Sequence, residues 1–534
     1  MQNSAPARVS WRDGLIIAAV YSFSLLLVAG FPHLRMAYPL DDSWIHQVVA
    51  RNLANDGTLG FIPAVRSSGS SSLLWSFILA AKWKFLPALN PVVYTYVISW
   101  ITFVVIGVTM FLMARRDGLP ETICWIWALA PALNGNFVWL GVIGMEHMLF
   151  AAISVGAIYF WFEHSRGSAV FAALCLGALT ITRPEGVILA VLVLLVVRQA
   201  HRSYRDVLIA ISIVTVFFVV GLIANRVTSN SWLPLTYVGR KWLYFGTENV
   251  PLATRIQFPL GVVMYTGFAW IGRAVFLLTG VTVILLALGL RRLWRLESRR
   301  CTVLCIWSGV LIAVYAALLP NMGIGGRYQP VFLLLTFPVM FIGLEAIISR
   351  LFRELRRGGM RAGAEVVVLL SLCLVSGVAS LVKWRQVWHD GVTVIESTHA
   401  RMGQYLVDNF HGQTKVAAFD IGRMGYIYGE HLSDLGGLTD SSFLPYLRQH
   451  RVLAYLNDRD IRYFVWPSSS DADTRLGAFL KLTPEVRQGL VTVARFCAPT
   501  DVWTTAFRCQ TLYRLKGPES IAQSPGDDTL FPRH

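Results

Sequence analysis

Two adjacent carboxylates, Asp41 and Asp42, follow the first long apolar run of the chain and begin the polar segment 41–47. A carboxylate at the edge of a membrane is partly desolvated, which raises its pKa and suits it to accept a proton from a substrate hydroxyl. The alternative is structural, because Asp before a helical segment caps free backbone N–H groups. Asp42 with Ser43 is the better placed cap, so Asp41 is the favoured base of the pair.

Four other polar segments carry cationic, acidic and aromatic side chains: 144–147, 182–186, 234–241 and 325–330. Arg and Lys in such turns suit a lipid phosphate, because their N–H groups match phosphate oxygens. The alternative for any single Arg is that its side chain extends to the lipid headgroups. The candidate phosphate-binding residues are Arg327, Lys241 and Arg240, and the candidate substrate-binding residues are His46, Glu146, Arg183, Tyr237 and Tyr328.

These polar segments separate long apolar runs. Of the 534 residues, 55% are hydrophobic and 15% are charged, whereas soluble proteins carry about 25% charged residues. Two semi-apolar stretches, 71–88 and 256–271, are interpreted as interfacial or re-entrant helices. The sequence predicts a polytopic α-helical membrane protein, because about eleven runs are long enough to cross the hydrocarbon layer: 14–31, 92–114, 122–140, 147–163, 168–183, 186–199, 207–225, 272–290, 302–320, 330–349 and 365–383.

The distribution of Arg predicts the orientation. With the N-terminus in the cytoplasm, the positive-inside bias is satisfied, because these loops all fall inside: 115–116, 163–168, 198–205, 291–300 and 350–361. An even number of spans would break that agreement. The net charge of +16 is then explained by orientation and by anionic lipid rather than by nucleic acid. We expect a multi-pass protein of the bacterial inner membrane, with its C-terminal domain outside the cytoplasm.

The chain changes character after about residue 383. Charge density rises, and β-like runs such as 416–419 and 463–466 alternate with helix-like stretches, which indicates a small α/β domain. The predicted domains are a transmembrane module 1–383 with its first outside loop 32–70, a soluble periplasmic α/β domain 384–516, and a disordered tail 517–534 rich in Pro, Ser and Asp.

One covalent cross-link is predicted, and no cofactor. Cys497 and Cys509 both lie in the C-terminal domain, where a disulfide requires an oxidising compartment. Paired carboxylates bind divalent ions, but two adjacent Asp are too few ligands for a metal site. We therefore predict no metal, although a divalent cation would be compatible with the pair.

Taken in order, these motifs resemble those of GT-C-fold glycosyltransferases, and more closely those of bacterial enzymes related to the mycobacterial terminal cell-wall arabinofuranosyltransferases. The resemblance covers roughly residues 35 to 470. Two positions depart from the family pattern: 66–71, where relatives often have an acidic and an aromatic residue, and His46, where a small or apolar residue is commoner. The segments that carry the resemblance are Asp41-Asp42 with 51–54, Gly57, Phe61 and 72–75, then 144–146, 182–186, 233–237 with Lys241, 326–328, 420–422 and 434–440.

The resemblance implies an inverting glycosyltransferase. It would move a sugar, with a pentofuranose such as arabinofuranose as one option, from a polyprenyl monophosphate to a hydroxyl of an envelope glycan or lipid. Asp41 or Asp42 would remove the hydroxyl proton, and Arg327 with Lys241 or Arg240 would stabilise the departing phosphate. Because both departures lie near the expected acceptor side, the sugar and the acceptor stay open.

Three other interpretations remain. The chain could be a GT-C enzyme with a pyrophosphate-linked donor, an O-antigen polymerase or ligase, or a transporter or flippase of lipid-linked sugars. Transporters tend to have two related halves with broken helices at mid-membrane. Here the polar motifs gather on one predicted side and no such halves are evident, which disfavours transport.

Overall fold

The structure is a computed structural model, and its contacts divide the chain into two units. The first, the membrane unit, comprises Met1–Arg35, Val93–Gly221 and Val250–Trp388, and the second, the sheet unit, comprises Met36–Val92, Leu222–Asn249 and His389–His534. The described residues are 10–62, 70, 72–196, 200, 202–232, 234–245, 250–266, 275–356, 363–410, 414–468, 480, 489–502 and 508–515. The predicted tail 517–534 lies outside them.

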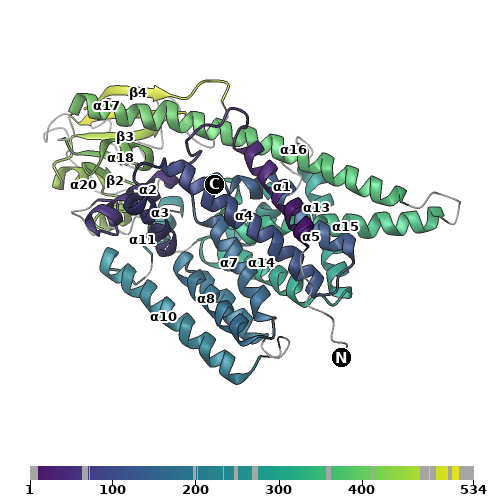
Figure 1. Ribbon diagram of the computed structural model, residues 1–534. Helices are drawn as coiled ribbons and strands as arrows, with labels where there is room; N and C mark the ends of the chain where they lie inside the picture. Colours follow the sequence, from purple (N-terminus) through teal and green to yellow (C-terminus); the bar gives the residue numbers. More distant parts are fainter. Residues whose placement is uncertain are drawn as a thin grey trace. The chain divides into compact units, whose positions relative to one another are not determined.

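The membrane unit is helical (Figure 1). Seven helices within the described residues are long and apolar enough to cross a membrane, and four shorter apolar helices accompany them. Each of the eleven predicted runs corresponds to one of these helices, so the polytopic helical fold is confirmed. The helices are α1 (Trp11–Val28), α4 (Pro91–Arg116), α5 (Glu121–Leu133), α6 (Gly135–Trp139), α7 (His147–Trp161), α8 (Arg166–Thr182), α9 (Gly186–Leu195), α10 (Tyr204–Ser229), α12 (Leu252–Thr266), α13 (Val275–Arg295), α14 (Arg299–Leu318), α15 (Pro330–Arg356) and α16 (Ala364–Ile395).

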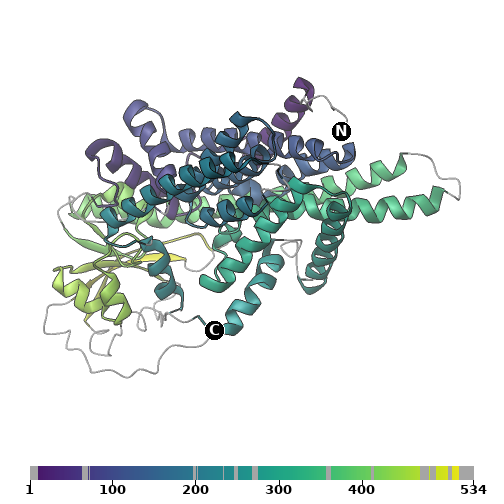
Figure 2. The ribbon, with the colours of Figure 1, turned by 90° about the horizontal axis from the view of Figure 1, so that it is seen from below.

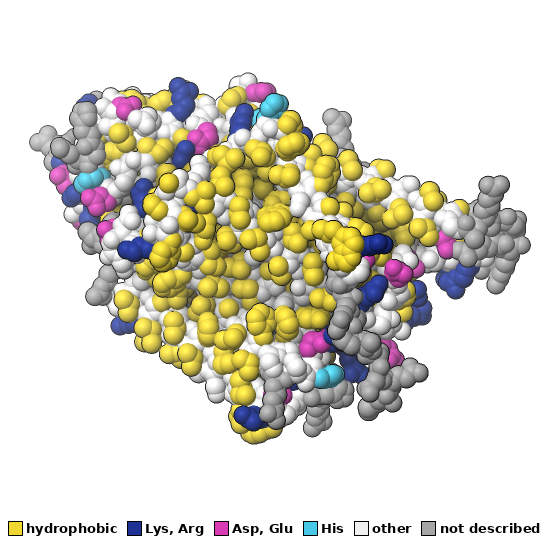
Figure 3. Space-filling view, in the orientation of Figure 1, with side chains coloured by type: hydrophobic (Ala, Val, Ile, Leu, Met, Phe, Trp, Pro, Cys, Tyr) yellow, Lys and Arg dark blue, Asp and Glu magenta, His cyan; other side chains and the backbone are white. Residues whose placement is uncertain are grey.

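Burial separates central from peripheral helices. Of the most apolar stretch of each helix, 78% is buried in α15 and only 11% in α10. Val216 and Val220 of α10 are among the apolar side chains that stay exposed. Figure 3 shows hydrophobic side chains gathered over the helices. A helix that leaves so much apolar surface uncovered is suited to contact with lipid.

Small residues allow the central helices to approach closely. α15 packs against α13, α5 and α7. At Gly289 of α13 an added Cβ would meet the backbone oxygen of Val339, and at Gly343 of α15 it would meet that of Leu285. Without a hydrophobic driving force between helices in lipid, such close backbone packing is a main source of cohesion.

An ionic cluster joins three predicted inside loops at one end of α7 and α14. Arg300 at the start of α14 donates to the Asp117 carboxylate at 2.7 Å and to Glu163 at 3.1 Å. Arg116 lies 3.3 Å from Glu163. These groups therefore hold the ends of α4, α7 and α14 together.

The sheet unit contains a five-stranded mixed sheet in the order β2-β1-β3-β5-β4. Strands of this sheet are drawn as green to yellow arrows in Figure 2. β1 is parallel to β2 and β3, and β5 is antiparallel to β3 and β4. A disulfide joins Cys497 and Cys509 across β4 and β5. The runs predicted at 416–419 and 463–466 are confirmed as strands. The strands are β1 (Val416–Ala418), β2 (Leu432–Asp434), β3 (Tyr463–Ser468), β4 (Leu490–Cys497) and β5 (Cys509–Leu515).

Helices cover both faces of this sheet. Because side chains alternate along a strand, Val416 and Ala418 join a core with α2, α17 and α18, whereas Ala417 joins one with α19 and α20. The helix that follows Asp41 is thus part of the core of the C-terminal sheet. The helices of this unit are α2 (Asp42–Asp56), α3 (Leu73–Phe85), α11 (Leu235–Phe245), η3 (Glu396–Ala400), α17 (Arg401–Phe410), α18 (Gly422–Tyr428), α19 (Leu444–Arg448) and α20 (Val452–Asp458).

Candidate active site

The carboxylate of Asp41 is held by the first turn of α18. Its Oδ2 accepts the backbone N–H of Gly422 at 2.6 Å, and its Oδ1 accepts that of Arg423 at 2.7 Å. The expectation that Asp42 caps the helix after it is wrong in detail. Asp41 occupies the N-cap position of α2 and makes no side-chain capping bond to it, because its oxygens are taken up by α18.

Two further ionisable groups lie beside Asp41. Ligand atoms of Asp41, His399 and Asp420 all lie within 4.8 Å of one another. The pKa of Asp41 is raised to about 6, chiefly because burial disfavours the charged form. His399 and the two N–H bonds oppose this rise, and Asp420 adds to it. Gln510 of β5 donates from Nε2 to Asp420 Oδ2 at 2.9 Å.

Asp42 has a cationic partner. Arg240 of α11 lies 3.6 Å from its Oδ2, and both side chains are largely buried. Tyr237, predicted to bind substrate, and Lys241, predicted to bind the donor phosphate, lie on the same helix and are half-buried. Part of the Arg240 charge is therefore directed at the Asp42 carboxylate.

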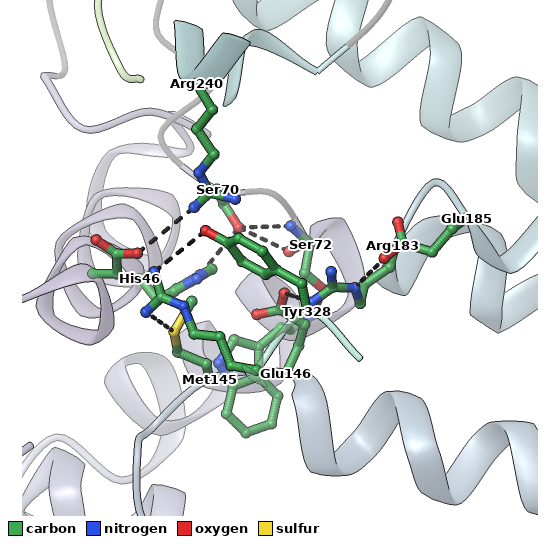
Figure 4. Close-up of polar contacts among 12 residues, drawn as sticks. His46, Ser70, Ser72, Met145, Glu146, Arg183, Glu185, Arg240 and Tyr328 are labelled. Atoms are coloured by element: carbon green, nitrogen blue, oxygen red, sulfur yellow. Dashed lines mark hydrogen bonds and ion pairs between the residues drawn. The ribbon is translucent and has the colours of Figure 1, made fainter. Parts of the chain in front are cut away.

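His46 contacts Ser70, and both lie at positions that depart from the pattern of the resembled family. It is 3% exposed, and its Nδ1 lies 3.3 Å from the hydroxyl oxygen of Ser70 (Figure 4). Ser70 in turn donates to the backbone oxygen of Ser72 at 2.9 Å, and the Ser76 hydroxyl donates to Ser70 at 2.7 Å. The rest of 66–71 lies outside the described residues.

In the membrane unit, Arg183 is the centre of a buried ionic network. It follows α8 and donates from Nε to Glu185 at 2.6 Å and from Nη2 to the Tyr315 hydroxyl at 2.7 Å. Its Nη1 lies 3.4 Å from Glu146 Oε1. Glu146 and Arg183 are 1% and 6% exposed. Their contacts join the ends of α7, α8 and α14 that lie opposite to the Arg300 cluster.

Arg327 lies next to this network in the same unit. Its Nη1 approaches Met145 Sδ at 3.6 Å, and its guanidinium carbon lies 5.3 Å from the Tyr328 ring centroid. The Arg183 guanidinium contacts the same ring at 5.8 Å. The turn that presents Arg327 needs glycine at Gly325 and Gly326, whose φ angles are +66° and +70°.

The predicted residues therefore form two groups. The membrane unit brings together Glu146, Arg183, Arg327 and Tyr328, and the sheet unit brings together Asp41, Asp42 and Arg240, with His46 on the same helix. The sequence reasoning missed His399 and Gln510. Asp420 had been singled out only by the resemblance, although its place after a β-like run was a usable signal, since ligand-binding residues often follow parallel strands.

Comparisons with solved structures give the fold. Over 95% of this chain and 99% of that chain, the structure is similar to ArnT from Cupriavidus metallidurans bound to undecaprenyl phosphate, with 13% identity and a TM-score of 0.54. It is also similar to the archaeal oligosaccharyltransferase AglB from Archaeoglobus fulgidus in complex with an inhibitory peptide and a dolichol-phosphate, with 14% identity and a TM-score of 0.50, covering 86% and 70% of the two chains. The protein is thus a polytopic helical membrane protein with a GT-C-like fold and a C-terminal mixed α/β domain.

Other comparisons are less informative. The mycobacterial arabinofuranosyltransferase AftD matches with 15% identity and a TM-score of 0.48 over 96% of this chain and 42% of that one. This similarity is too low to support an inference about the sugar. Residues 388–513 match a family described as a domain of unknown function (DUF8728). A comparison with curated protein sequences finds no match.

Proposed function

We propose that this protein is a membrane-embedded, inverting glycosyltransferase that moves a sugar from a polyprenyl monophosphate to a hydroxyl of an envelope glycan or lipid. The observation that carries the proposal is the anchored carboxylate pair Asp41-Asp42 on a chain whose GT-C-like fold extends over nearly its whole length. The structures of two proteins with this fold contain undecaprenyl phosphate or dolichol-phosphate, which supports a polyprenyl-phosphate carrier here.

One carboxylate of the pair is the general base. It removes the acceptor hydroxyl proton as that oxygen attacks the anomeric carbon and inverts its configuration. The lipid phosphate that leaves is a weak base, so no general acid is needed. Asp41 is oriented by two backbone N–H groups and Asp42 by Arg240, and this fixed orientation suits both to a reaction that requires positioning.

Arg327 is the proposed ligand of the lipid phosphate. Its guanidinium contacts Met145 Sδ and the Tyr328 hydroxyl, and the residue is only 5% exposed. A desolvated cation stabilises a departing phosphate more strongly than one in water. Lys241 and Arg240 are the second cationic candidates, and Arg240 shares its charge with Asp42.

Arg183 and Glu146 have a different proposed role. The Arg183 charge is already balanced by Glu146 and Glu185, so we propose that this network orients Tyr328 rather than binding phosphate itself. His46 and Tyr237 are proposed to contact the acceptor or the sugar. A pentofuranose such as arabinofuranose is the first sugar to test.

The proposed location is the bacterial inner membrane, with the sheet unit outside the cytoplasm. The Cys497–Cys509 disulfide supports this orientation, because disulfides persist in oxidising compartments. The Arg300 cluster joins loops predicted to face the cytoplasm.

Two measurements on the detergent-purified chain test this function. Mass spectrometry of copurified lipid should detect a polyprenyl monophosphate sugar, and a radiolabelled form of that lipid should transfer its sugar to an acceptor glycan. A copurified pyrophosphate-linked sugar would instead favour the pyrophosphate-donor enzymes. Translocation of labelled lipid in liposomes without sugar transfer would contradict the proposal and favour a flippase.

A further inference from the structure

Three acceptor groups converge in the sheet unit, next to Asp41. They come from different elements: Asp41 at the start of α2, His399 in the π-helical turn η3, and Asp420 directly after β1. His399 Nε2 lies 3.5 Å from Asp420 Oδ2, and all three ligand atoms lie within 4.8 Å of one another. Short π-helical turns often occur at functional sites.

The hydrogen bonds of His399 favour one tautomer of its neutral ring. The Thr398 hydroxyl donates to the backbone oxygen of Val394 at 2.6 Å. Its oxygen therefore accepts from His399 Nδ1, at 2.7 Å, so Nδ1 bears the hydrogen. In the neutral ring the lone pair is then on Nε2, which faces Asp420. A histidine that ligates a metal commonly has its other ring N–H held by such a partner.

Gln510 provides an independent observation. Its Nε2 donates both to Asp420 Oδ2 at 2.9 Å and to His399 Nε2 at 3.1 Å, which agrees with a lone pair on Nε2. Its Oε1 has no hydrogen-bond partner among the described residues, although the side chain is 2% exposed. Half a turn of the amide would exchange the two atoms and bring a fourth acceptor towards the cluster. A buried amide oxygen without a partner is costly, and in the turned orientation a cation bound by the cluster would satisfy it.

We propose that Asp41, His399 and Asp420 bind one divalent transition-metal ion, of the Mn²⁺ or Zn²⁺ class. Two carboxylates and one imidazole suit these ions better than Mg²⁺ or Ca²⁺, which prefer oxygen ligands alone. The 3.5 Å between His399 Nε2 and Asp420 Oδ2 is close to the edge of about 3.4 Å expected for a tetrahedral site with bonds of about 2.1 Å. The distances from the Asp41 ligand atom to the other two ligand atoms, which lie within 4.8 Å, would shorten as the ion forms bonds to all three.

This inference does not depend on the proposed glycosyl transfer, because metal binding is measured without a sugar substrate. The full-length protein in detergent is stripped with EDTA and titrated with Mn²⁺, which is followed by electron paramagnetic resonance. Zn²⁺, Mg²⁺ and Ca²⁺ then compete for the bound Mn²⁺. We expect one ion per chain, displaced by Zn²⁺ at much lower concentration than by Mg²⁺ or Ca²⁺.

Matched variants distinguish this site from other acidic groups. His399→Ala and Asp420→Asn should abolish stoichiometric binding, and Thr398→Val should weaken it about 10- to 100-fold, because it removes the partner of Nδ1. His431→Ala and Asp460→Asn, in the same unit but away from the cluster, should bind as the wild type does. Elution of each variant as a single species verifies folding, and Thr398→Val serves if His399→Ala does not fold.

Two outcomes would overturn the proposal. Either neither Mn²⁺ nor Zn²⁺ binds at one ion per chain, or binding survives both Asp420→Asn and Thr398→Val unchanged. The cluster would then be neutralised by a proton on His399 rather than by a metal. Loss of metal with retained sugar transfer would leave the proposed function in place, since the two measurements are separate.

Discussion

The carboxylate of Asp41 accepts a hydrogen bond of 2.6 Å from the backbone N–H of Gly422, 381 positions later in the chain. The backbone oxygen of Asp41 lies so close to Gly422 that an added Cβ would collide with it. This double contact ties the start of α2 to the first turn of α18, and it requires glycine for space rather than for backbone conformation.

Gly422→Ala should therefore destabilise the sheet unit. The added methyl group collides with backbone rather than with a flexible side chain, and overpacking of this kind costs about 1–3 kcal/mol. Thermal unfolding of the sheet unit checks this prediction. Gly309→Ala is the control, because a Cβ there meets nothing within 4 Å. Equal unfolding temperatures for the two variants would refute the close contact.

Arg183→Ala should destabilise the membrane unit by roughly 3–5 kcal/mol, because it leaves Glu146 and Glu185 buried without their cation. The exposed Arg226 is the control, and Arg226→Ala should change stability by no more than about 0.5 kcal/mol. Adding Glu185→Gln to Arg183→Ala should restore part of the loss. Unfolding in detergent measures all three, and an Arg183→Ala protein as stable as the control would contradict the network.

Asp434 should make stability depend on pH. Burial raises its pKa to about 6, against the bonds from Thr439, Gly436 and Leu438, while the unfolded value is 3.8. The folded state therefore holds the proton more tightly, and this contribution is fully present below pH 3.8. This contribution to the free energy of unfolding, about 3 kcal/mol, is lost as the pH rises through about 6.

Unfolding of the wild type and of Asp434→Asn between pH 4 and 8 tests this sign. The difference in stability between the two should change up to about pH 7 and be constant above it. The stability of Asp460→Asn, at an exposed position, should depend on pH as that of the wild type does. A difference that stays constant throughout the range would show that Asp434 titrates normally.

Arg327→Ala should weaken binding of the lipid donor at least about tenfold, because hydrogen bonds to charged groups contribute about 1.5–3 kcal/mol. The matched control is Arg350→Ala, on the exposed surface at the other end of α15. Binding is measured with a labelled polyprenyl monophosphate in detergent. Equal affinities for the two variants would exclude Arg327 from the phosphate site.

The helices and two of the strands were predictable because the signal is local. A run of apolar residues long enough for a membrane indicates a span by itself, and 416–419 and 463–466 have the composition of buried strands. The turn before Arg327 was also recognisable, since Gly325 and Gly326 mark positive φ angles.

The surroundings of Asp41 could not be predicted, because they depend on contacts between distant segments. From the local sequence, Asp42 was expected to cap the helix that follows it. In the structure Asp41 is the N-cap residue of α2, and its carboxylate accepts two N–H groups from the first turn of α18. No pattern in 396–400 marks His399, whose role arises from a π-helical turn and from Gln510 in β5.

The central claim is that the carboxylate pair drives glycosyl transfer. The most direct measurement compares the turnover of wild type, Asp41→Asn, Asp42→Asn and the exposed control Asp460→Asn with a radiolabelled polyprenyl-phosphate sugar and an acceptor glycan. We predict that at least one variant of the pair loses about 100-fold or more, since a general base contributes about 10² to 10⁴ in rate, while Asp460→Asn is unaffected. Wild-type turnover in both Asp41→Asn and Asp42→Asn would contradict the account.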